Sequence, residues 1–174
     1  MAETDFGNAI DIDPNNPEYH ANLGLAYYKL EKYDEAKSEF DSAIRLDGSY
    51  ARAYDGRANL YKTQGQTADA VKDFVNAGKF YNRQAVASNN DIKKQDDLYN
   101  SARDMFKAAI ASDKNCAEAY YRLGLLETNN SNYRESLPNY DKALDLKISD
   151  NLLETILMRR AAGQITNCNI ITTQ

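Results

Sequence analysis

The sequence has little of what catalytic and metal sites are built from. Its 174 residues include one histidine, two cysteines (Cys116 and Cys168) and no tryptophan. A Ser-His-Asp triad, or a zinc site that uses histidine and cysteine, needs partners that this chain lacks. It also has no glycine-rich phosphate-binding loop. We therefore expect a protein that is not an enzyme, with no catalytic residue, no metal site and no cofactor.

Residues that interrupt helices are also scarce, and long apolar runs are missing. Three prolines and eight glycines suit a mostly helical chain. No run approaches the roughly 18 apolar residues of a membrane-spanning helix, and the first residues do not form a signal peptide. The net charge of −5 argues against a general nucleic-acid binder. We expect no membrane insertion, no nucleic-acid partner and a cytoplasmic location.

What the sequence does contain is a repeated helical pattern. In residues 22–47, NLGLAYYKLEKYDEAKSEFDSAIRLD, apolar and small residues recur at helical spacing. A shift of 34 residues brings Ala36, Phe40 and Ala43 onto Ala70, Phe74 and Ala77. Residues 117–146 carry a further copy, with Leu123, Gly124, Tyr133, Tyr140 and Ala143 in the corresponding places.

This pattern resembles the tetratricopeptide repeat (TPR) family, whose 34-residue unit has Leu-Gly, Tyr, Ala, an aromatic residue, Ala and Pro at fixed offsets. The resemblance implies an all-α fold, a right-handed superhelix of stacked antiparallel helix pairs that share stability with their neighbours. It divides the chain into the second helix of a truncated repeat (1–16), repeats at 17–50, 51–84 and 117–150, an irregular repeat (83–116), a capping helix (151–164) and a tail (165–174). Because the chain starts in mid-repeat, we expect a segment of a longer array.

The repeat offsets have physical causes. Gly24 and Gly124 are expected where the first helix of a unit crosses its partner closely, with Ala58 in that role in the second repeat. The aromatic residues at 40, 74, 106 and 140 are expected to fill the space between units. His20 stands where the family prefers a large aromatic residue, so we interpret it as a packing residue. Leu152, Leu153, Ile156 and Leu157 are expected to cover the end of the last repeat, or else to belong to the first helix of a further repeat.

The middle of the chain leaves two interpretations open. Apolar spacing from Val71 to Ala85 predicts one helix that runs to about Ser88, and the spacing from Ile92 to Ala109 predicts another that begins near Asp91. Asn89-Asn90 would then be a turn between two long helices. The alternative is a flexible polar loop inside a degenerate repeat.

Family resemblance also implies where a partner binds. In TPR arrays the first helix of each unit lines a concave groove, and positions 2, 5, 6, 9, 12 and 13 point into it. From these positions we predict a partner-binding set: Asn22, Leu25, Tyr28, Lys29, Arg52, Asp55, Asn59, Lys62, Tyr121, Arg122 and Leu125. Some relatives bind the C-terminal carboxylates of chaperones through a Lys, Arg and Asn clamp, and only Asn59 and Arg122 fit that clamp here.

The leading functional hypothesis is a protein–protein interaction scaffold that binds a peptide or helix of a partner protein in this groove. A second hypothesis is the non-catalytic recruiting arm of a larger enzyme, which in some glycosyltransferases carries an asparagine ladder; only Asn22 sits at the ladder position. A third is a self-assembly module that associates through the exposed ends of the array or through its irregular middle.

Overall fold

The computed structural model describes residues 2–88, 90–146 and 156–158, with side chains from residue 6 onward. Within these ranges the chain is a series of helices and contains no strand. The helices are α1 (Ala2–Ile12), α2 (Pro17–Lys29), α3 (Tyr33–Leu46), α4 (Ala51–Thr63), α5 (Thr67–Ala87), α6 (Ile92–Ser112), α7 (Ala117–Asn129) and α8 (Tyr133–Asp145).

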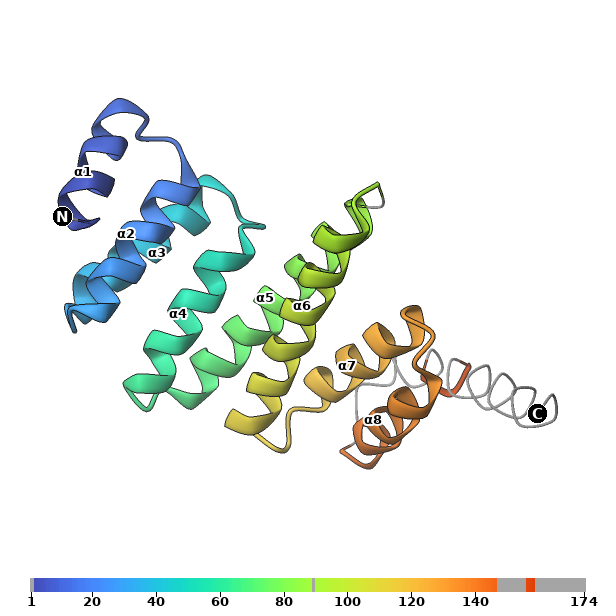
Figure 1. Cartoon of the computed structure of the whole chain (residues 1–174). Helices are drawn as coiled ribbons and strands as arrows, with labels where there is room; N and C mark the ends of the chain where they lie inside the picture. The colour runs from blue at the N-terminus through green and yellow to red at the C-terminus, as the bar shows by residue number, and fades with distance from the viewer. Residues whose placement is uncertain (1, 89, 147–155, 159–174) are drawn as a thin grey trace.

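The helices stack in chain order into an elongated array (Figure 1). α2 pairs with α3, α4 with α5, α5 with α6, and α7 with α8. Between these pairs, α3 packs on α4 and α6 packs on α7. α1 packs against α2 as α3 packs against α4. The prediction of an all-α solenoid of stacked antiparallel helix pairs is confirmed.

Each regular helix pair is closed by a turn with one residue in the left-handed region. The residue is Glu31 (φ 59°) between α2 and α3, Gly65 (φ 74°) between α4 and α5, and Ser131 (φ 62°) between α7 and α8. Only the second turn uses glycine, which adopts this conformation without a steric cost. The same backbone turn therefore forms from three different residues, and two of them carry strain.

Glycine allows the first helix of a pair to approach its partner closely. A Cβ added to Gly24 would stand 2.9 Å from the Phe40 ring and 3.2 Å from the Ala36 carbonyl oxygen. A Cβ on Gly124 would meet Tyr140 at 2.9 Å and the Ser136 carbonyl oxygen at 3.2 Å. The close crossings predicted at both glycines are confirmed.

The middle of the chain consists of two long helices, α5 and α6, of 21 residues each. The Asp91 side chain caps α6 by accepting a hydrogen bond from the Lys94 backbone N–H (3.0 Å), and Gln95 Nε2 donates to the Ala85 carbonyl oxygen (3.2 Å). The long-helix interpretation is therefore the one that the structure shows, with Ser88 and Asn90 in turn conformation. Asn89, predicted to share that turn, lies outside the described residues.

The long α5 contributes to two units. Its N-terminal half packs Ala70 and Phe74 into a cluster with Ala58 of α4. Further along, a Cβ on Gly78 would stand 2.8 Å from Phe106 Cδ1 of α6, which repeats the crossing of Gly24 with Phe40. The first helix of the third unit therefore lies inside α5 and begins ahead of residue 83, where the sequence had placed it.

Two charged side chains take repeat positions that are apolar or aromatic in other units. Arg57 stands where the first and last repeats have leucine, and its guanidinium binds Asp73 (Nε–Oδ2, 2.7 Å) and Asp41. Glu127 stands where earlier repeats have tyrosine, and it accepts hydrogen bonds from Arg103 (2.6 Å) and Asn132 (2.8 Å). These ion pairs, in which Asp73 and Glu127 are buried, join α4 to α3 and α5, and α7 to α6.

His20 has a structural role at the first helix pair. Its Nδ1 lies 2.7 Å from Glu39 Oε2, and its Nε2 lies 3.0 Å from the Pro14 carbonyl oxygen. The imidazole therefore joins α2 to α3 and to the turn that precedes α2, which supports its interpretation as a packing residue.

Ile156 packs against the last helix pair, where it is fully buried in a cluster with Tyr121, Tyr140 and Ala143. Leu157, predicted to pack beside it, is 47% exposed. Leu152, Leu153, most of the predicted capping helix and the tail at 165–174 lie outside the described residues.

Candidate binding groove

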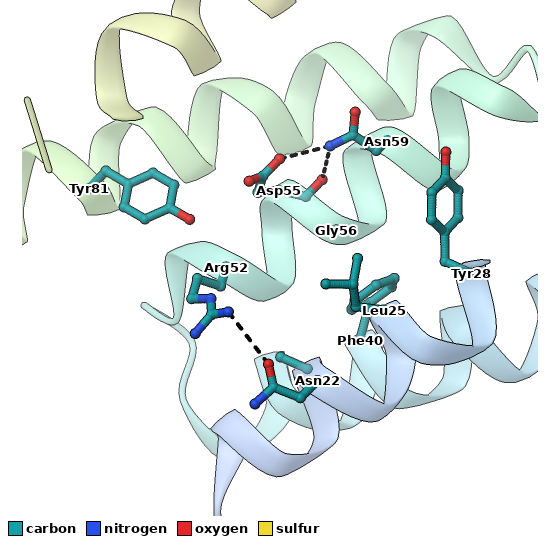
Figure 2. A pocket seen from close by; sticks show the side chains of 10 residues that line it. Asn22, Leu25, Tyr28, Phe40, Arg52, Asp55, Gly56, Asn59 and Tyr81 are labelled. Carbon is teal, nitrogen blue, oxygen red and sulfur yellow. Dashed lines mark hydrogen bonds between the residues drawn. The ribbon is translucent and has the colours of Figure 1, made fainter. Parts of the chain in front are cut away.

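The first groove pocket, called here the α2–α4 pocket, has a volume of about 270 Å³. α2 and α4 supply facing sides and Phe40 of α3 lies between them, while Tyr81 reaches in from α5 (Figure 2). The lining residues are Ala21, Asn22, Leu25, Tyr28, Phe40, Arg52, Asp55, Gly56, Asn59 and Tyr81.

The floor of the α2–α4 pocket depends on a glycine of α4. A Cβ added to Gly56 would overlap the ring of Phe40, with Cδ1 at 3.1 Å and two other ring atoms nearer. Because Phe40 is 1% exposed and packed among other buried residues, it has little room to move. Gly56 therefore lets α4 lie directly on the aromatic floor and keeps the pocket open above it.

Polar groups of the pocket form a short network across the two helices. Asn59 Nδ2 donates to the Asp55 side chain (2.8 Å) and to the Asp55 carbonyl oxygen (2.9 Å). Arg52 Nη2 lies 3.5 Å from Asn22 Oδ1, which links α4 to α2 (Figure 2). This long contact is weak, and Arg52 also forms an exposed ion pair with Glu18 (3.7 Å). Because exposed pairs contribute little stability, a ligand can replace these contacts.

Two ionisable groups in the pocket are shifted by their surroundings. Burial raises the pKa of Asp55, and the hydrogen bond from Asn59 offsets this only in part. Burial, with the nearby Asp55 carboxylate, raises the pKa of Tyr81 to about 12. The Tyr81 hydroxyl stays protonated at physiological pH, as in an ordinary tyrosine, and can serve as a hydrogen-bond donor.

A second groove pocket, called here the α5–α7 pocket, has a volume of about 200 Å³. Its lining residues are Lys79, Asn82, Arg83, Phe106, Arg122 and Leu125. Phe106 contributes to it as Phe40 contributes to the first pocket. The two pockets have different chemistry, because the second brings together three cationic side chains.

The structure brings eight of the eleven predicted binding residues to these pockets. Asn22, Leu25, Tyr28, Arg52, Asp55 and Asn59 line the first, and Arg122 and Leu125 line the second. Lys29 and Lys62 are exposed at the C-terminal ends of α2 and α4 and line neither pocket.

The prediction that Tyr121 lines the groove is wrong. The sequence placed it in the groove as an apolar anchor, but it is 5% exposed and belongs to the cluster that Ile156 covers. Its ring centroid lies 6.4 Å from that of Tyr140. The segment that follows α8 therefore uses Tyr121 for packing, and the side chain does not offer a surface to a partner.

Sequence reasoning missed the groove residues of α5. Lys79, Tyr81, Asn82 and Arg83 all line one of the two pockets. They were not found because the third unit was expected to begin at residue 83. Gly78 was the available signal, because a glycine inside a helical pattern lowers helix stability and can mark a close crossing.

Other kinds of site have no support in the described part of the chain. No group of three histidine, cysteine, aspartate or glutamate residues there is placed to hold a metal ion. Among the same residues, no helix has the length and apolar character needed to cross a membrane.

Comparison with known families gives three matches. Residues 2–31 match the TPR repeat description, and residues 17–50 and 94–151 match the tetratricopeptide repeat description. The gap between the matches contains α4, α5 and the turn between the two long helices.

Curated relatives are longer proteins that contain a similar segment. Human DnaJ homolog subfamily C member 7 is 32% identical over 65% of this chain and 24% of its own length. Human mitochondrial import receptor subunit TOM70 is 22% identical over 86% of this chain and 32% of its own length. The chain thus spans about a quarter of the first of these relatives and about a third of the second.

Solved structures give similar but distant matches. The TPR protein YrrB is 20% identical, with coverage of 84% of this chain and 94% of YrrB and a TM-score of 0.41. The thermophilic TPR protein TTC0263 of Thermus thermophilus is 16% identical, with coverage of 86% and 82% and a TM-score of 0.47. With its family matches and its stack of antiparallel helix pairs, the chain belongs to the tetratricopeptide repeat family, whose repeats generally mediate protein–protein interaction.

Proposed function

We propose that the chain binds a peptide segment of a partner protein in the groove lined by α2, α4, the C-terminal half of α5, and α7. The observation that carries this proposal is the α2–α4 pocket, in which amide and guanidinium groups stand around an aromatic floor. A peptide offers the matching groups, since its backbone supplies donors and acceptors and its side chains supply apolar surface.

Two asparagines favour a peptide over a purely apolar ligand. Asn22 on α2 and Asn59 on α4 lie on opposite sides of the pocket. The Asn22 amide can donate to the backbone of an extended chain, and the Asn59 side-chain oxygen can accept from it while Asn59 Nδ2 donates to Asp55. Neither contact depends on the sequence of the peptide. Tyr28 and Leu25 then supply contacts to the side chains of the ligand.

The free-energy cost of the buried Asp55 carboxylate supports the same proposal. Its carboxylate is held in a buried place that raises its pKa, so its ionised form costs stability at neutral pH. An ionisable group whose pKa is shifted by burial and which lines a pocket is typical of a functional site. A neighbouring amide N–H of a bound peptide would offset that cost by donating to the carboxylate.

We propose binding without turnover. Members of this family are typically non-catalytic, and the pocket residues have roles in hydrogen bonding and packing rather than as a nucleophile with an adjacent base. The recruiting-arm hypothesis describes the same binding activity in a longer protein that is an enzyme. The full-length sequence would distinguish it from a binding scaffold.

Self-association is a second candidate, favoured by one observation. Val86 and Ile92, on either side of the turn between the long helices, are 57% and 73% exposed. Light scattering across a range of concentrations tests this candidate. A constant monomer mass would exclude it, and a dimer lost in Val86→Ser with Ile92→Ser would support it.

The binding proposal is tested by selecting peptides from a random display library on the immobilised chain and measuring their affinity for variants. Asn22→Ala and Tyr28→Ala should each weaken binding by about 1 kcal/mol or more. Asn22→Ala should leave the melting temperature nearly unchanged, whereas Tyr28→Ala should lower it as well, because it removes packing and the hydrogen bond to Thr63. Asn139→Ala on α8, outside both pockets, is the matched control. Failure to select any peptide, or equal affinity for all variants, would contradict the proposal.

A further inference from the structure

The α5–α7 pocket is the counterpart of the α2–α4 pocket in the next stretch of the groove. The correspondence follows from the two close crossings, of Gly24 with Phe40 and of Gly78 with Phe106. Counting from these glycines and along α4 and α7, corresponding positions carry different residues. In the α5–α7 pocket, Lys79 takes the position of Leu25 and Asn82 that of Tyr28. Arg122 takes the position of Gly56, and Leu125 that of Asn59.

These exchanges turn a mixed pocket into a cationic one. Lys79, Arg83 and Arg122 all line the α5–α7 pocket, and none of its described lining residues is acidic. The chain as a whole carries a net charge of −5, so this concentration of positive charge is local. A cleft lined by one sign of charge attracts a ligand group of the opposite sign.

The three cations are not committed to strong partners within the described chain. Lys79 has no hydrogen bond or ion pair there, and the guanidinium of Arg83 stacks over the Phe80 ring at 5.9 Å. Arg122 pairs with Glu118 at 3.2 Å, one turn away on the same helix. Exposed pairs of that kind contribute little stability, so Arg122 can exchange Glu118 for a ligand.

Asn82 adds a polar group to the same pocket. Its buried side-chain oxygen has no hydrogen-bond partner among the described residues. An amide oxygen accepts hydrogen bonds, so its partner is a donor. In the proposed peptide complex a backbone N–H can supply that donor, while the three cations face an acidic side chain of the same peptide.

We propose that the α5–α7 pocket binds an aspartate or glutamate side chain within the partner peptide, while Asn82 accepts a hydrogen bond from the peptide backbone beside it. Phe106 and Leu125 contact the methylene groups of that side chain. The inference rests on the proposed peptide-binding function, and it assigns to the second pocket the selection of an internal acidic residue.

The test uses peptides selected on the chain from a random display library, synthesised with acetylated and amidated ends. The selected peptides should share an acidic residue, and its replacement by glutamine or asparagine should weaken binding about tenfold or more. Lys79→Gln with Arg83→Gln should cause a similar loss and should abolish the difference between the acidic and amide peptides.

Two further variants separate a specific pocket from general electrostatics. Arg134→Gln with Lys142→Gln on α8 removes the same charge from exposed positions outside both pockets, and should change affinity less than about twofold. Lys79→Glu with Arg83→Glu should invert the preference towards a peptide with lysine at the acidic position, which a merely unfolded variant would not do.

The outcomes also distinguish this inference from the function on which it rests. Selected peptides with no shared acidic residue, and a normal loss of affinity in Asn22→Ala, would overturn the acidic pocket and leave the binding groove standing. Binding that requires a free C-terminal carboxylate would overturn the assignment to an internal side chain. If no peptide is selected, both proposals fail.

Discussion

Gly78 of α5 lies against the ring of Phe106 of α6, and an added Cβ would stand 2.8 Å from Phe106 Cδ1. The corresponding distances at Gly24 and Gly124 are 2.9 Å, to Phe40 and Tyr140. The long helix α5 therefore closes one unit of the array and opens the next. This relationship gives the third unit its place and brings Lys79, Asn82 and Arg83 to the groove.

The close crossing predicts opposite effects for the same substitution at two glycines. Gly78→Leu should destabilise the chain by roughly 1–3 kcal/mol or more, because the side chain overpacks the contact with Phe106. Gly7→Leu in α1 is the control, since nothing lies within 4 Å of its added Cβ, and it should be neutral or stabilising because leucine favours helix. Thermal melts of the two variants check this, and equal melting temperatures would contradict the crossing.

The strained turns predict that glycine stabilises two sites. Glu31 and Ser131 have positive φ values at the position that Gly65 occupies in the turn between α4 and α5. Removing the side chain relieves about 1–2 kcal/mol of strain, and the greater freedom of glycine in the unfolded chain offsets part of it. Glu31→Gly and Ser131→Gly should each raise the free energy of unfolding by up to about 1 kcal/mol. Urea denaturation would contradict the turn assignment if both variants lost stability.

The ion pair of Arg57 with Asp73 predicts strong coupling between its partners. Arg57→Leu restores the residue type of the other repeats but leaves the carboxylate of Asp73, 3% exposed, without its guanidinium. The single substitution should therefore cost about 3–5 kcal/mol. Adding Asp73→Asn should recover part of that loss, and a double-mutant cycle from urea denaturation measures it. Costs that simply add would show that the two side chains do not stabilise one another.

Asp55 predicts a change in stability with pH. Since burial raises its pKa above the unfolded value, the folded state binds the proton more tightly. Its contribution to stability is complete below the unfolded pKa and is lost as pH rises through the folded pKa. Asp55→Asn, which has no charge to bury, should melt above the parent at pH 7, and the difference should shrink as pH falls into the ordinary range of aspartate. A constant difference at every pH would contradict the burial effect.

Much of the fold could be predicted from the sequence because the same packing residues recur at the same spacing in several units. Ala36 with Phe40, Ala70 with Phe74, and Ala102 with Phe106 recur at one spacing, and all six are 2% exposed or less. The repeat spacing also led to the α2–α4 pocket, since all of its lining residues except Tyr81 come from regular units.

The second pocket was missed where the repeat spacing changes. Gly78 and Phe106 are 28 residues apart, whereas Gly24 and Phe40 are 16 apart. The lengthened α5 and α6 hairpin separates the two partners in sequence without changing how they pack. The burial of Tyr121 was missed for another reason, because it depends on a contact with Ile156 of the segment after α8.

The central claim is that a partner peptide lies in the groove on the first helices of the units. Backbone amide chemical shifts of the isotopically labelled chain, recorded as a selected peptide is added, test it most directly. The account predicts that the largest changes lie in α2, α4, the C-terminal half of α5, and α7, around Asn22, Asn59 and Asn82. Changes confined to α3, α6 and α8, with these three residues unaffected at saturation, would contradict it.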